Sequence, residues 1–432
     1  GKWKRISWDE ALSEIADSII DAIQENGPES VIHASTPSQG GFMAGITLGP
    51  LIQNLGALNT DVQGEINDFA PGLYITFGKF NPVSSVDDWF QSELIFIWHR
   101  NPVYTAIPWY HFVAEARYKG AEVVTVAPDF NASAVHADYH ATVRPGTDAA
   151  LALAMCKTII DEGLYDASFV KEQTDLALLV RLDNHRFLRA RDVQDGGRED
   201  QFYFYDSNTR QLVEAPRGPL TLGKLDPALE GTFQAKLKDG TGVEVTPVFA
   251  LLRRRLEDYT PEKASQICGT NPEVIRLLAR KTASKKTNML TGWNAGKYYH
   301  GDLMERAMCL LIALTGNWGK KGTGIRSWTV GMFDGQFIFS EKTKAGPEET
   351  KRILQMRDQM VEALKMQDPT MTEELAAVEL ARTMSGLEST VPPVFMWYYH
   401  CGYRENWNRP EWNDPAMKRT FDEYMQEALS KG

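Results

Sequence analysis

The sequence has few cysteines and no cluster of them. It contains four, Cys156, Cys268, Cys309 and Cys401, and no two of them form a CxxC pair. This spacing excludes an iron–sulfur or zinc cluster held by closely spaced cysteines of this chain. We expect the four thiols to be buried as small apolar side chains, although Cys401 stands in a run of polar aromatic residues.

Long apolar runs and an excess of basic residues are also missing. The longest apolar run, residues 307–314, is far shorter than the roughly 18 residues that a membrane-spanning helix needs. Lys and Arg number 46 against 57 Asp and Glu, and this formal net charge of -11 argues against nucleic-acid binding. The opening segment, GKWKRISWDEAL, lacks the apolar centre of a signal peptide. We therefore expect a chain that does not itself cross a membrane and whose targeting signal was removed or lies elsewhere.

Apolar strands that alternate with helices predict an α/β fold. Residues 93–98 and 121–127 are continuous apolar runs, which are typical of parallel strands covered on both faces. Shorter strands are expected at 140–143 and 288–292, and helices are expected after the strands at 93–98, 140–143 and 288–292. A length of 432 residues suggests two or three domains.

Residues 201–249 interrupt this pattern with alternating polar and apolar residues around turn sequences, which predicts β hairpins. We expect two interleaved Rossmann-like parallel-sheet domains with this β-rich insertion. The first domain would consist of residues 1–90 and 280–432. The second, residues 90–280, would be inserted into it and bind a dinucleotide.

Polar residues and a glycine follow the predicted parallel strands. Asp129 stands just after the strand at 121–127, while Gly146, Thr147 and Asp148 precede the next helix. Acids at the carboxyl edge of such sheets commonly bind a sugar hydroxyl, and a helix N-terminus after a glycine can bind phosphate. We expect Thr147 and Asp148 to cap that helix. No GxGxxG follows these strands, so we expect a nucleotide to bind without the usual dehydrogenase signature. The alternative that Asp129 is only a turn residue stays open.

One carboxylate, Asp68, stands between two apolar segments in a stretch that contains Pro71 and Gly72. These residues predict a turn rather than a helix. An Asp in a turn commonly caps the local backbone. The alternative is a hard oxygen ligand presented on a loop. A second glycine-rich stretch, residues 316–324, would either let the backbone approach a large ligand or form a flexible loop.

Five segments stand in the order and spacing found in the catalytic alpha subunits of molybdopterin oxidoreductases of the dimethyl sulfoxide reductase family: WKRISWDEAL, ARYKGAEVVTVAPDF, GTDAALAL, YYHGDLMERA and GNWGKKGTG. The chain resembles the branch of this family in which Asp binds the metal. Through KYYHGDLMER and YYHCGY it is most similar to the ethylbenzene dehydrogenase alpha subunit and to anaerobic hydrocarbon and steroid side-chain dehydrogenases. The family's N-terminal iron–sulfur module and C-terminal domain have no counterpart here, so we expect a central fragment or part of a split protein.

The resemblance implies that Asp68 binds molybdenum in a bis(molybdopterin guanine dinucleotide) cofactor. Lys297 and His300 would act near the metal, Lys297 as a cationic hydrogen-bond donor, although a surface role for Lys297 stays open. Where ethylbenzene-type sequences have a His, this chain has Pro37, which leaves the catalytic base unassigned. The other cofactor-binding residues that the resemblance implies are Asn101, Asp129, Gly146, Thr147, Asp148, Gly292, Gly316, Asn317, Gly319, Gly322 and Gly324.

The implied activity is the oxygen-independent hydroxylation of an activated C–H bond in a small apolar hydrocarbon or a steroid side chain, with water as the oxygen source. The alternatives are an oxyanion reductase for nitrate, selenate or chlorate, a sulfoxide reductase, a nitrite oxidoreductase, and a non-catalytic cofactor-binding fragment. The resemblance also implies an iron–sulfur cluster in the missing N-terminal part, an iron–sulfur beta subunit, a haem gamma subunit, and a periplasmic location reached by export in the folded state.

Overall fold

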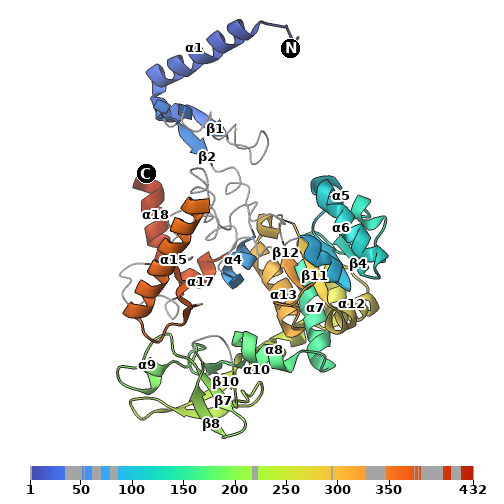
Figure 1. The fold of residues 1–432 in the computed structure, drawn as a ribbon, viewed down its shortest axis with the longest axis vertical. Helices are drawn as coiled ribbons and strands as arrows, with labels where there is room; N and C mark the ends of the chain where they lie inside the picture. The colour runs from blue at the N-terminus through green and yellow to red at the C-terminus, as the bar shows by residue number, and fades with distance from the viewer. Residues whose placement is uncertain are drawn as a thin grey trace.

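The computed structural model of the chain describes residues 2–34, 51–52, 54–60, 70–77, 86–216, 222–292, 295–326, 347–373, 375–377, 379–380, 402–409 and 420–431. Figure 1 shows a main body of helices around a sheet, with a β-rich portion at one end and an arm that carries α1 (Trp8–Asn26) at the other. Asp68, Cys401 and Pro37 lie outside the described residues.

The main body is built on a sheet of five parallel strands in the order β12-β11-β3-β4-β5. The central strand is β3, and all five of its side chains are buried, as the apolar run predicted. The strands span β3 (Leu94–Trp98), β4 (Glu122–Ala127), β5 (Tyr139–Thr142), β11 (Thr287–Thr291) and β12 (Gly324–Arg326). The α/β fold with a parallel sheet is thereby confirmed.

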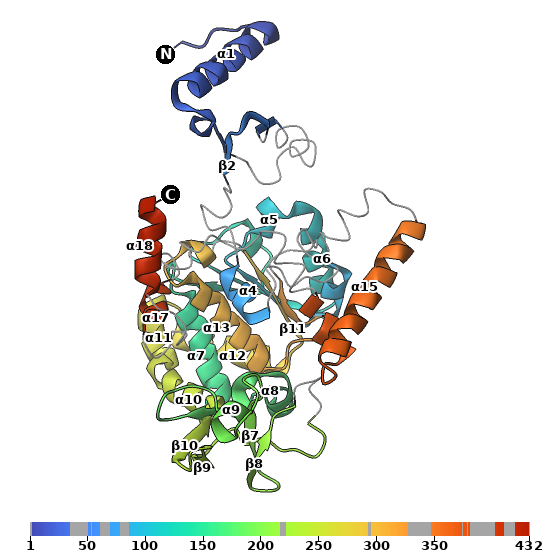
Figure 2. The same cartoon turned by 90° about the vertical axis from the view of Figure 1, so that its left-hand side faces the viewer.

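Helices cover both faces of this sheet. Phe96 and Trp98 face a large apolar cluster shared with the helices on one side, while Ile95 and Ile97 face a smaller cluster with α6. Figure 2 shows α7, α12 and α13 side by side. The covering helices are α6 (Ile107–Tyr118), α7 (Asp148–Asp161), α11 (Pro261–Cys268), α12 (Pro272–Ser284) and α13 (Gly301–Leu314). Thr260 and Asn271 cap α11 and α12 through their side chains, each ahead of a proline at the first position.

The β-rich insertion contains both expected hairpins. Antiparallel pairs join β7 (Tyr203–Asp206) to β8 (Gln211–Glu214) and β9 (Phe233–Lys236) to β10 (Gly242–Pro247). A further strand that the sequence pattern did not indicate, β6 (Leu179–Arg181), pairs with β10. Short helices connect these elements to the rest of the chain: α8 (Ala167–Gln173), α9 (Ala190–Val193) and α10 (Val248–Arg255).

The two ends of the chain contribute the remaining elements. In the arm, β1 (Ile32–Ala34) pairs in parallel with β2 (Leu58–Thr60). The other elements are α4 (Pro71–Phe77), α5 (Pro102–Thr105), α15 (Pro347–Gln367), α17 (Arg404–Trp407) and α18 (Phe421–Lys431). Among the described residues, no helix combines the length and apolar character that crossing a membrane requires.

The sheet joins strands from both sides of residue 280, because β11 pairs directly with β3. The division of the whole chain into 1–90 with 280–432 and 90–280 stays a prediction. The turn expected at Pro71 is wrong, since Pro71 opens α4, where its fixed φ suits a first helical position.

Candidate functional site

The carboxyl edge of the sheet gathers most of the predicted nucleotide-binding residues. Because β3, β4 and β5 are adjacent and parallel, the loops that follow them lie at one edge. Asn101 follows β3, and its side-chain Oδ1 accepts a hydrogen bond of 2.6 Å from Ser133 Oγ in the loop after β4. Asp129, also after β4, is exposed. The structure thus brings these loops together, with Asn101 already joined to its neighbour.

A buried hydrogen bond connects the end of β3 to the start of α7. Trp98 Nε1 donates to Asp148 Oδ1 at 2.8 Å, and both residues are almost fully buried. The expected capping by Thr147 and Asp148 is wrong, because neither side chain makes a cap hydrogen bond to α7. The Thr147 hydroxyl donates instead to the carbonyl of Arg144, and the Asp148 carboxyl is held by the indole.

Gly146 links this edge to the segment that carries Lys297 and His300. Its φ of +79° is in the left-handed region, and a Cβ there would stand 3.2 Å from the ring of Tyr298. Lys297 ends the short 3-10 helix Ala295–Lys297 and is exposed, and His300, half-buried with a φ of 57°, precedes α13. The structure therefore places two sets of predicted residues side by side.

The half-buried Arg100 supplies positive charge at the same edge. It follows β3 directly, and burial lowers the pKa of its guanidinium to about 10. Together with the backbone at Gly146 and the start of α7, this donor set suits an anionic group such as a phosphate.

The first turn of α13 brings three distant segments together. Tyr403 OH, from the stretch just before α17, donates to Asp302 Oδ2 at 2.9 Å, and Gly402 lies against the His300 imidazole. From the other side, Gly72 N of α4 donates to Glu305 Oε2 at 2.7 Å. Burial raises the pKa values of the Asp302 and Glu305 carboxyls, that of Glu305 well above its usual range. The sequence analysis did not single out Glu305, whose only signal was its place within the KYYHGDLMER segment.

The glycine-rich loop lies at the opposite edge. It runs from the end of α13 to the start of β12, which is the amino edge of a parallel sheet. There Asn317 Oδ1 accepts from Thr287 N, and its Nδ2 donates to the carbonyl of Thr282, each at 2.9 Å. Gly322 N donates to Asp88 Oδ1. The loop thus joins the amino ends of neighbouring elements, and the pterin-binding role predicted for its residues is not tested. The residues concerned are Gly316, Asn317, Gly319, Gly322 and Gly324.

Gly292 directly follows β11 at the carboxyl edge, where it lies against the backbone carbonyl of His99. The Asp68 loop is not described, but α4, which begins three residues later, is packed on α13, and Ala70 and Leu73 are fully buried.

The described cysteines, Cys156, Cys268 and Cys309, are free and buried as expected. Within the described ranges, no group of three His, Cys, Asp or Glu could hold a metal ion.

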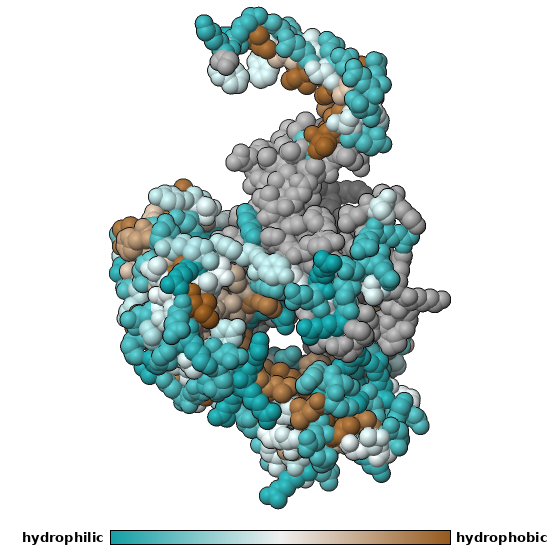
Figure 3. Space-filling model, turned by 180° about the vertical axis from the view of Figure 1, so that it is seen from behind, coloured by the Kyte–Doolittle hydropathy of each residue, from teal (hydrophilic) through white to brown (hydrophobic). Residues whose placement is uncertain are grey.

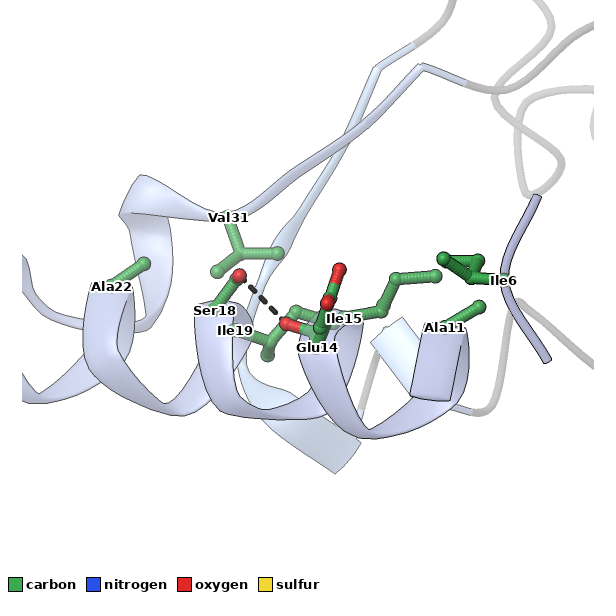
Figure 4. A pocket seen from close by; sticks show the side chains of 8 residues that line it. All are labelled: Ile6, Ala11, Glu14, Ile15, Ser18, Ile19, Ala22 and Val31. Carbon is green, nitrogen blue, oxygen red and sulfur yellow. Dashed lines mark hydrogen bonds between the residues drawn. The ribbon is translucent and has the colours of Figure 1, made fainter. Parts of the chain in front are cut away.

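A groove of about 450 Å³ lies away from this edge, on α1, between its apolar face and Val31 (Figure 4). Ser18 Oγ donates to the Glu14 carbonyl beside it. Figure 3 shows hydrophobic surface along this arm. The groove has one carboxylate, Glu14, among largely apolar neighbours, and it contains none of the predicted site residues.

A parallel sheet with helices on both faces and its polar loops at the carboxyl edge is the arrangement of doubly wound α/β proteins. Within that class, residues 1–385 match the family model for molybdopterin oxidoreductase, and the chain belongs to this family.

Two curated relatives are reductases of chlorine oxyanions. The chain is 39% identical over 378 residues to perchlorate reductase subunit alpha of Dechloromonas aromatica (strain RCB), covering 81% of this chain and 40% of that protein. It is 39% identical over 329 residues to chlorate reductase subunit alpha of Ideonella dechloratans, covering 74% and 35%. Among solved structures, acetylene hydratase from Pelobacter acetylenicus is similar, with 22% identity, a TM-score of 0.43, and coverage of 74% of this chain and 34% of that one. The chain thus spans two-fifths or less of the length of these two curated relatives.

Proposed function

We propose that this chain is the central, cofactor-binding part of a catalytic subunit that removes an oxygen atom from an oxyanion such as chlorate or perchlorate. The family match over residues 1–385 carries the proposal, and the two chlorine-oxyanion reductases at 39% identity support the substrate class. The molybdenum cofactor, when bound, supplies two-electron oxygen-atom chemistry, and the protein supplies binding, orientation and electrostatics.

The residues of the carboxyl edge would hold the anionic, nucleotide-bearing part of the cofactor. Arg100 would pair with a phosphate, and Gly146 would let the backbone approach it closely. The hydrogen bond from Trp98 to Asp148 would keep the start of α7 in place. Asn101 and Asp129 would contact the sugar or base of a guanine dinucleotide. These assignments remain proposals, as does the bis(guanine dinucleotide) form of the cofactor.

Asp68 would bind the metal through a carboxylate oxygen, a hard ligand suited to a high-valent ion. Lys297 would attract an anionic substrate with its positive charge, and His300 would accept or donate a proton at its imidazole. The contact between Gly146 and Tyr298 supports this grouping, because it holds the 295–300 segment beside the carboxyl edge.

Hydroxylation of a hydrocarbon or steroid side chain is the second candidate. The segments KYYHGDLMER and YYHCGY favour it, and the structure places Tyr403 from the second beside Asp302 from the first. The tyrosines of these two segments would give the site an aromatic character, which suits an apolar substrate. We rank it second because the two curated relatives act on oxyanions, as their names state.

Partner subunits follow from the same comparison. Both curated relatives are named as alpha subunits and are more than twice as long as the matched part. We propose that an iron–sulfur beta subunit, a haem gamma subunit and an iron–sulfur cluster outside these 432 residues transfer the electrons. We also propose a periplasmic location.

The test begins with the purified complex that contains this chain. Molybdenum and pterin should be present at about one cofactor per chain, and reduced methyl viologen should support turnover of chlorate or perchlorate. Ethylbenzene with an artificial electron acceptor is the competing assay. Turnover of ethylbenzene but of no oxyanion would reverse the ranking, and a complex without molybdenum or pterin would leave only the non-catalytic alternative.

A further inference from the structure

Helix α4 begins without a cap of its own. Its first residue, Pro71, has no N–H, and Ala70 before it has no side-chain oxygen, so the N–H groups of Gly72 and Leu73 need acceptors from elsewhere. Glu305 provides one from a position 233 residues away, with its Oε2 2.7 Å from Gly72 N. Like the Gly72 N–H, the Leu73 N–H lowers the pKa of the same carboxyl, against the larger rise that burial causes. A residue of α13 therefore caps α4.

The backbones of the two helices are in direct contact at this point. A Cβ on Gly72 would overlap the Asp302 carbonyl and stand 2.5 Å from Glu305 Cβ, so only glycine allows this approach. One turn further on, the Thr76 hydroxyl donates to the Gly72 carbonyl at 2.7 Å. Glu305 itself is 0% exposed, and among the described residues its Oε1, which is buried, has no hydrogen-bond partner. Since an unsatisfied buried polar atom carries a cost, the carboxyl is an expensive side chain to keep in this position for packing alone.

The capped end of α4 is the end nearest Asp68 in the chain. Asp68 is two residues before Ala70, which is fully buried, so the Cα atoms of the two residues are at most about 7–8 Å apart. The cap on Gly72 therefore fixes the described start of α4, from which this short connection leads to Asp68.

We propose that Glu305 is a positioning residue for the molybdenum-ligand loop, holding the start of α4 against α13 so that Asp68 is presented in a fixed place. This inference rests on the proposed function, in which Asp68 binds the metal. Glu305 acts through Gly72 and Leu73 and need not touch the metal or the substrate. The residue that caps α4 therefore comes from the distant KYYHGDLMER segment, in which Glu305 is the ninth residue.

The experiment uses the intact complex and compares Glu305→Ala, Glu305→Gln and a control, Leu311→Ala, with the parent. Gln retains a carbonyl oxygen that can accept from Gly72 N, whereas Ala retains none. Leu311 is also on α13 and 0% exposed, so its truncation leaves a cavity without touching the cap. The readouts are hydrogen–deuterium exchange of residues 61–77, molybdenum per chain, and the electron paramagnetic resonance spectrum of Mo(V).

We expect Glu305→Ala to raise amide exchange in residues 61–77 about tenfold, the effect of losing one to two buried hydrogen bonds. Its molybdenum content should fall, or its Mo(V) spectrum should shift. Glu305→Gln should stay close to the parent, and Leu311→Ala should keep the parental spectrum even where it lowers stability. Parental exchange and a parental spectrum in Glu305→Ala would overturn the proposal. Equal damage from Glu305→Gln would overturn it as well, because the acceptor would then be irrelevant.

Asp68→Ala in the same complex separates this inference from the proposed function. If Asp68→Ala changes the Mo(V) spectrum and Glu305→Ala does not, the positioning role fails and the ligand assignment stands. If Asp68→Ala keeps the parental spectrum and molybdenum content, the ligand assignment fails and the positioning role fails with it. Should Glu305→Ala not accumulate as a folded chain, the comparison of Glu305→Gln with the more drastic Gly72→Ala decides. Gly72→Ala should then reproduce the loss and Glu305→Gln should not.

Discussion

Replacing Asn317 with Ala tests whether this residue binds cofactor or holds the sheet together. Its buried side chain makes three hydrogen bonds of 2.9 Å, to Thr287 N, to the Thr282 carbonyl and to Thr315 Oγ1. At roughly 1 kcal/mol each, their loss should lower the free energy of unfolding by about 3 kcal/mol. The Thr282 carbonyl keeps a bond from Thr287 Oγ1, so the newly unsatisfied group is the Thr287 N–H.

Urea unfolding followed by far-ultraviolet circular dichroism measures this loss, with Asn208→Ala as the matched control. Asn208 is exposed, and its amide donates only to the Lys224 carbonyl, so its removal should cost well under about 1 kcal/mol. We expect the Asn317→Ala chain to be less stable than the parent, and the molecules that remain folded to bind molybdenum. A variant as stable as the parent that has lost its cofactor would refute it and would restore the role that the sequence implied.

Three further predictions rest on single contacts. Trp98→Phe should lower the free energy of unfolding by about 2 kcal/mol, because the buried Asp148 carboxyl loses its hydrogen-bond donor. The control is Trp3→Phe: Trp3 is fully exposed, so this variant should unfold at nearly the same urea concentration as the parent. Burial raises the folded-state pKa of Glu305 above its unfolded value, so its contribution to stability is fully present below the unfolded pKa and is lost as the pH rises towards the folded pKa. The parent should therefore lose stability relative to Glu305→Gln as the pH rises above the ordinary carboxyl range. Asp206 has the opposite sign: hydrogen bonds from Asp226 N and Thr209 lower its pKa, so Asp206→Ala should lower the melting temperature at pH 7 and progressively less as pH falls through the carboxyl range.

Local sequence patterns sufficed for elements whose cause is local. The apolar run at 93–98 is a fully buried strand because both sheet faces are covered, and Thr260 and Asn271 cap their helices because cap and helix are adjacent in the chain. The turns at 207–210 and 237–241 likewise bring their flanking strands into hairpins. The family resemblance, carried by short segments in order, was sound at the level of the family.

Tertiary structure decided which of these elements meet. The pairing of β11 with β3 joins residues nearly two hundred positions apart, and no local period reveals such a partner. The same holds for the loop at 316–324, which lies at the amino edge because it precedes β12. The ligand cradle that its glycines suggested stays a prediction. Asp148 looked like a cap, yet the Trp98 indole holds its carboxyl.

The sequence by itself determined the apolar strands of the parallel sheet, the hairpins and the family, because each depends on neighbouring residues or on segments in order. Only the tertiary structure decided that Glu305 caps α4, that Gly146 meets Tyr298, and that the glycine-rich loop is remote from the carboxyl edge. The physical reason is that a hydrogen bond or close approach between distant segments depends on how helices pack and strands order in the sheet, and a linear pattern carries no record of either.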